Sequence, residues 1–110
     1  MKNYYKIIDD IRKEIVDQIV ELVKLGEEDE LFISEFSPGE SPLLKEGLDD
    51  SDTFTLDSLI LTEKGLEFNG SSNWTNISLR EEDVSMDNLI NILEFLDAYK
   101  EDIKELNNGI

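Results

Sequence analysis

The chain contains no cysteine and no histidine among its 110 residues. Without cysteine it cannot form disulfides, thiolate metal sites or a cysteine nucleophile. Without histidine it lacks the side chain whose charge most often changes near neutral pH, so we do not expect a simple pH switch. We predict no metal site and no cofactor for this chain.

Long hydrophobic runs are also absent, and this bears on where the protein works. No apolar segment approaches the ~20 residues that a membrane-spanning helix requires. No apolar region with a cleavage site follows the first residues, as it would in a secretory signal. We therefore expect a cytoplasmic protein, and the glycosylation tripeptides that start at Asn69, Asn73 and Asn76 are then coincidental.

Basic residues are scarce, since 10 of them stand against 27 acidic residues and leave a net charge of −17. A surface this acidic repels the phosphates of nucleic acids and of anionic membranes. Direct binding to either is therefore not expected. The same charge must destabilise the folded state through self-repulsion at low salt, so apolar burial has to hold the fold.

The length and composition predict one folded domain over residues 1–110. A chain of 110 residues has the commonest size of a single domain. Its hydrophobic fraction of 39% is sufficient for one core, so disorder is not expected despite the charge.

Two segments have the apolar periodicity of amphipathic helices, over about 3–25 and about 86–106. Gly26 is placed to end the first helix in a left-handed conformation, and Ser85 to cap the second. The stripe of the first helix consists of Tyr4, Ile8, Ile11, Ile15, Ile19 and Leu22.

The middle of the chain predicts strands over about 31–36, 53–62, 66–69 and 74–79. Residues 37–52 contain both prolines and no sustained periodicity, and are interpreted as a long loop. Asn69 and Gly70 form a dipeptide typical of a hairpin turn.

The predicted fold is α+β. An antiparallel meander of three to four strands is flanked by an N-terminal and a C-terminal helix, in the order α-β-β-β(-β)-α. Both helices are expected on one face of the sheet, which leaves the other face to polar residues or to a partner.

No catalytic or metal-binding residues are assigned. A calcium loop starting at Asp50 would need an oxygen ligand where Phe54 stands and a glutamate where Leu61 stands. Asp57, Glu63 and Lys64 are residue types of metal nucleases, but no basic surface is present to hold DNA. Gly-rich phosphate loops and serine elbows are absent too, so we expect no enzyme. An unrecognised carboxylate enzyme remains an alternative.

Charge is concentrated in the middle of the chain, where Lys45 is the only basic residue between Glu27 and Asp57. A negative surface can steer basic partners and can imitate the phosphate field that nucleic-acid-binding proteins recognise. The alternative is that acidic loops only maintain solubility. The acidic residues predicted to contact a partner are Glu27, Glu28, Asp29, Glu30, Asp49, Asp50 and Asp52.

The leading hypothesis is a non-enzymatic protein-binding module that docks on a basic protein and, as an inhibitor that mimics a nucleic acid, blocks it by occupying its phosphate channel. Nucleic-acid-binding enzymes are one such class, and the small inhibitors that phages and mobile elements use against host nucleases share this size and charge. Trp74 is either an exposed anchor for such a partner or a core aromatic at the start of a strand. The alternative function is a structural protein that forms homo-oligomers through the uncovered sheet face or an exposed helix stripe.

Overall fold

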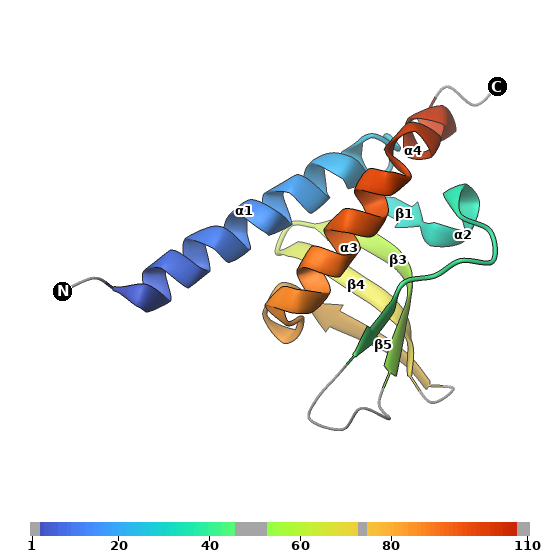
Figure 1. Ribbon diagram of the computed structural model, residues 1–110. Helices are drawn as coiled ribbons and strands as arrows, with labels where there is room; N and C mark the ends of the chain where they lie inside the picture. The colour runs from blue at the N-terminus through green and yellow to red at the C-terminus, as the bar shows by residue number, and fades with distance from the viewer. Residues whose placement is uncertain (1–2, 46–52, 73–74, 108–110) are drawn as a thin grey trace.

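Helices and strands follow one another along the chain in the predicted α+β order (Figure 1). The computed structural model describes residues 3–45, 53–72 and 75–107. The elements in these ranges are α1 (Tyr4–Lys24), β1 (Glu30–Phe32), α2 (Ile33–Phe36), β2 (Leu43–Lys45), β3 (Thr53–Thr62), β4 (Gly65–Ser72), β5 (Thr75–Arg80), the 3-10 helix η1 (Glu81–Asp83), α3 (Met86–Ala98) and α4 (Lys100–Asn107).

The sheet is antiparallel and is built on β3, its longest strand. β4 pairs with one edge of β3 and β5 pairs with β4, which confirms the predicted meander. β1 and β2 both pair with the other edge of β3, where Leu31 lies opposite Leu59 and Leu44 opposite Phe54. Because these two short strands share one edge, the sheet is only four strands wide.

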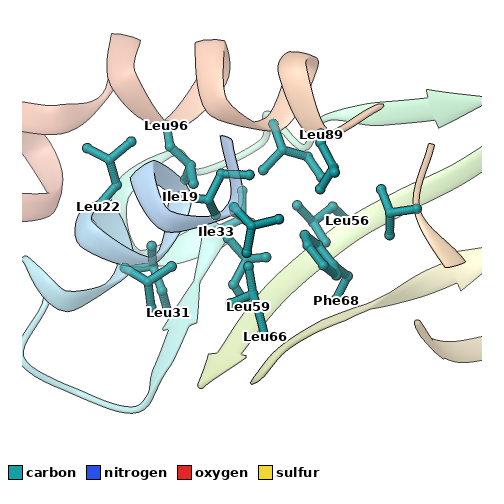
Figure 2. Close-up of a cluster of buried hydrophobic side chains, with 14 of the residues drawn as sticks. Ile19, Leu22, Leu31, Ile33, Leu56, Leu59, Leu66, Phe68, Leu89 and Leu96 are labelled. Atoms are coloured by element: carbon teal, nitrogen blue, oxygen red, sulfur yellow. The ribbon is translucent and has the colours of Figure 1, made fainter. Parts of the chain in front are cut away.

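The helices α1 and α3 pack against each other on one face of the sheet (Figure 1). Figure 2 shows the core between the two layers, where Ile19, Leu89 and Leu96 of the helices lie above Leu59 and Phe68 of the sheet. Alternate residues of β4 are buried and those between them are half-exposed. The apolar cluster therefore lies between a layer of helices and one face of the sheet.

Side-chain caps fix the starts of the two long helices. The Asn3 side chain accepts a hydrogen bond from the Lys6 amide at 3.1 Å. At the start of α3 the Ser85 hydroxyl accepts from the Asn88 amide at 3.2 Å, as predicted. The prediction for Gly26 is wrong, because right-handed turns continue through it and the reversal falls on Glu27, with a φ of 57°.

The edge of the sheet formed by β1 and β2 differs from the prediction at two points. The predicted strand over 31–36 pairs only as far as Phe32, after which Ile33 and Phe36 are both buried on the single turn of α2. A spacing of three residues is helical and not extended. The predicted loop over 37–52 contains β2, which forms because the edge of β3 beyond β1 still offers unpaired backbone groups.

Asn69 and Gly70 lie inside β4 and do not form the predicted turn. They pair with Ser78 and Ile77 of β5. A β-carbon on Gly70 would lie 2.0 Å from the Thr55 carbonyl oxygen and 2.7 Å from Cζ of Phe54. Glycine is therefore required at position 70, because the β3 backbone and the Phe54 ring lie too close for a β-carbon. Close approach of another part of the protein is a common reason for glycine within a strand.

The predicted C-terminal helix over about 86–106 is interrupted at Tyr99, which separates α3 from α4. The Tyr99 ring packs on Phe36 and Phe95, with ring centroids 5.9 and 4.9 Å away. Its hydroxyl donates a hydrogen bond to the Glu40 carboxylate, and this bond is the main cause that raises the pKa of Tyr99 above its ordinary value. The contacts of Tyr99 with Phe36 of α2 and with Glu40, four residues further along the chain, therefore fix the residue at which the helix is interrupted.

Replacing Gly70 with alanine tests the close approach of β3 and β4. We expect Gly70→Ala to lower the free energy of unfolding by at least about 2 kcal/mol, because a backbone oxygen must move to admit the new carbon. The matched control is Gly26→Ala, where the nearest atom is Leu31 Cδ1 at 3.4 Å and a change within ~1 kcal/mol is expected. Urea unfolding followed by circular dichroism measures both, and equal losses would contradict this role of Gly70.

Candidate protein-binding surface

The first two turns of α1 extend beyond the sheet and the other helices. Figure 1 shows the N-terminal half of this helix projecting to one side of the molecule. A helix of 21 residues is roughly 32 Å long at 1.5 Å per residue, and the whole molecule measures 55 × 32 × 25 Å along its principal axes. We call residues 4–11 the overhang, and every one of them is exposed.

The overhang carries an exposed apolar surface made by five large side chains. Between 45% and 83% of their surface is accessible to solvent, whereas Ile19 further along the same helix is fully buried. Three of the five continue the helix face of Ile15 and Ile19 at steps of three and four residues. The five side chains are Tyr4, Tyr5, Ile7, Ile8 and Ile11.

The size of this surface distinguishes it from scattered exposed residues. At ~200 Å² for a fully exposed large side chain, the accessible fractions of the five residues sum to on the order of 500 Å². This is at the upper end of what monomeric proteins expose, and such patches often mark interaction sites. Phe32 and Ile90, the other exposed large hydrophobic residues of the described chain, lie on different elements.

Arg12 anchors α1 at the point where the overhang ends. Its Nη2 atom donates hydrogen bonds to the carbonyl oxygens of Glu81 and Val84, in the segment that joins β5 to α3. A guanidinium that binds two backbone carbonyls restrains the helix at this point. The overhang therefore begins at a residue that is attached to the body of the protein.

The charges around the overhang are mixed, in contrast to the net charge of −17 of the whole chain. Within the described residues the one ion pair is between Glu101 and Lys104, at 3.5 Å. The charged side chains that flank the apolar surface therefore form no ion pair within the described chain and are available to pair with charges of either sign on a partner. They are Lys6, Asp9, Asp10, Lys13 and Glu14.

The predicted acidic contact residues are only partly placed by the structure. Glu27, Glu28 and Asp29 are exposed in the turn between α1 and β1. Glu30 is half-buried on β1 and accepts a hydrogen bond from the Ser58 hydroxyl at 3.1 Å. Asp49, Asp50, Asp52 and Trp74 lie outside the described residues, so the acidic contact surface as a whole stays a prediction.

A groove of about 570 Å³ runs between α1 and the turn from β3 to β4. Its apolar part contains Val16, Val20 and Leu66, and its charged groups are of both signs. No group of three acidic side chains in the described parts of the chain is placed to hold a metal ion. None of the helices described is long and apolar enough to cross a membrane.

No family model, curated protein or solved structure matches this chain. The exposed surface of the overhang is thus the feature from which a function can be inferred. The sequence periodicity places Tyr4, Ile8 and Ile11 on the same stripe as the buried Ile19 and did not reveal their exposure. The signal that could have revealed it is length, because a helix of roughly 32 Å exceeds the width of a sheet of three or four strands that lie about 4.8 Å apart.

We expect the apolar residues of the overhang to contribute little to folding. Ile8→Ala and Ile11→Ala should each lower the free energy of unfolding by less than about 1 kcal/mol, since both side chains remain about half exposed. Ile19→Ala, at a fully buried position of the same helix, should cost about 2 to 5 kcal/mol. Urea unfolding measures the three variants. A loss at Ile8 as large as that at Ile19 would show that the overhang is packed in solution.

Proposed function

We propose that this protein is a non-enzymatic protein-binding module that docks on its partner through the overhang. The observation that carries the proposal is the apolar surface of Tyr4, Tyr5, Ile7, Ile8 and Ile11, which the fold itself leaves uncovered. Covering on the order of 500 Å² of apolar surface yields roughly 10 kcal/mol before the costs of association are subtracted.

The chemistry of the surface favours a helix or an apolar groove as the partner's contribution. Tyr4 and Tyr5 are aromatic side chains of the kind that dominate the energetics of interfaces. Ile8 and Ile11 add the three- and four-residue spacing with which one helix packs on another. A partner of this kind would extend the apolar seam that α1 already forms with α3.

The charge of the molecule favours a basic partner. A net charge of −17 attracts positively charged proteins at long range and raises their association rate. The exposed Glu27, Glu28 and Asp29 lie on the described part of the acidic segment. In this proposal the apolar overhang supplies affinity and the acidic body supplies steering. Imitation of a nucleic acid, the more specific version, remains a prediction.

A basic amphipathic helix tests the proposed mode of binding. The probe is a fluorescently labelled 20-residue peptide of leucine and lysine, titrated with the full chain and followed by fluorescence anisotropy. We expect the double variant Ile8→Ser/Ile11→Ser to weaken binding by about ten-fold or more, because two apolar contacts are lost. The control Ile90→Ser makes the same change at an exposed isoleucine of α3 and should leave affinity unchanged.

Salt separates the two contributions to binding. Raising the ionic strength should slow association of the peptide with little effect on its dissociation, because exposed charges are screened. Equal affinity of the parent and the double variant would show that the overhang is not the contact surface. Failure of the parent chain to bind the peptide at low salt would contradict the proposal of a basic partner.

A further inference from the structure

The strand β5 forms a free edge of the sheet. It pairs with β4 on one side, and no described strand lies on its other side (Figure 1). The opposite edge is built differently, because β1 and β2 are three residues each and α2 interrupts them. Short, interrupted strands are a common protection against further strand pairing. The molecule thus protects one edge of its sheet and leaves the other open.

The backbone groups available on this edge follow from the pairing of β4 and β5. The Arg80 amide donates to the Asp83 carboxylate at 3.2 Å, so it points away from β4. Hydrogen bonding alternates along an antiparallel strand, so the amides and carbonyls of Ser78 and Asn76 point the same way. The pair of Ser72 and Thr75, which are separated by two residues in the chain, supports this alternation. The two residues that close a hairpin in this way exchange backbone hydrogen bonds, so the backbone groups of Thr75 point towards β4 and those of Asn76 point away from it.

β5 also lacks the usual chemical protection of an edge. Its pairing with β4 is continuous from Ser72 opposite Thr75 to Glu67 opposite Arg80, without a bulge. The strand contains no proline or lysine, and Arg80 at its end is its only charged residue. In a chain with 34% charged residues, the segment from Phe68 to Leu79 has no charge at all. From Thr75 to Leu79 this edge is regular, uncharged and open to another strand.

We propose that β5 pairs with β5 of a second copy of this chain, antiparallel and around a two-fold axis. In an antiparallel pair, residues directly opposite each other lie on the same face of the sheet. With Ser78 on the axis, Ile77 of each copy lies opposite Leu79 of the other. Both side chains are half-buried and pack against the core. Pairing would therefore complete their burial and join the two sheets into one.

The distribution of charge favours a second copy over another protein as the occupant. Two bodies with a net charge of −17 repel each other wherever their acidic surfaces approach. They can meet most easily along a surface without charge, and the β4–β5 hairpin carries the longest uncharged segment of the sequence. A basic partner would gain more from the acidic surfaces than from this edge. The contact is also self-complementary, as a two-fold interface must be.

Sedimentation of the full chain at several concentrations and salt levels tests the proposal. We expect a reversible dimer whose dissociation constant falls at least about ten-fold between 0.05 and 1 M NaCl, because salt screens the repulsion between the bodies. Binding of a basic partner through the overhang should respond to salt in the opposite direction. A monomer at all salt levels up to about 1 mM protein would overturn the inference.

Two substitutions on β5 target the contact directly. Ile77→Lys places a charge on the core-facing side of the edge. Ser78→Pro removes an outward-pointing amide without breaking a backbone hydrogen bond to β4, although it also removes the hydroxyl that donates to Asn69 Oδ1 at 2.6 Å. Both variants should be monomeric, and circular dichroism establishes that they fold. The control Ile60→Lys makes the same change on β3, where Glu30 and Glu67 are the cross-strand neighbours, and should remain a dimer.

Two further variants identify the surface. Ile8→Ser should leave the dimer unchanged, and conversion to a monomer would assign self-association to the overhang and overturn the role of β5.

Since the chain has no cysteine, Ser78→Cys introduces a single thiol. A short bis-maleimide should crosslink it between copies, whereas Ser34→Cys, exposed on α2, should not be crosslinked. Equal crosslinking of the two variants would contradict the two-fold axis at Ser78.

Discussion

The packing of the second half of α1 against α3 and the sheet is the contact on which the rest of the structure depends. Ile19 and Val23 are completely buried there, and they join the two helices to the apolar face of β3 and β4. This contact occupies only part of the helix. The helix has the length that its own sequence periodicity dictates, whereas the sheet has the width that four strands allow. Because the helix is longer than the sheet is wide, its first two turns extend past the sheet and remain exposed.

Charge has a secondary role in the folding of this chain. The described residues contain one ion pair, on the exposed surface of α4, and such pairs contribute little to stability. The fold therefore rests on apolar burial and on backbone contacts such as those of Arg12. In the proposed function the excess acidic charge acts between molecules: it would attract basic proteins at long range and would limit contact between copies to surfaces without charge.

The periodic elements of the fold could be predicted from the sequence, and the exceptions have identifiable causes. The stripe of α1, the meander and the cap at Ser85 follow local rules, so local patterns were sufficient. The break at Tyr99 and the position of Gly70 depend on Phe36 and Phe54, which lie far away in the sequence. The exposure of the overhang was missed for a related reason: a helical stripe shows which face of the helix is apolar, but not how far the rest of the protein extends along that face.

Arg12 has a mechanical consequence for the two surfaces of the molecule. Its guanidinium connects the base of the projecting helix to the two carbonyl groups of the connection that leaves β5. Tilting of the projecting helix would therefore pull, through this side chain, on the backbone that follows Arg80, the last residue of β5. A molecule bound to the overhang and a strand paired with β5 would both act on this short connection.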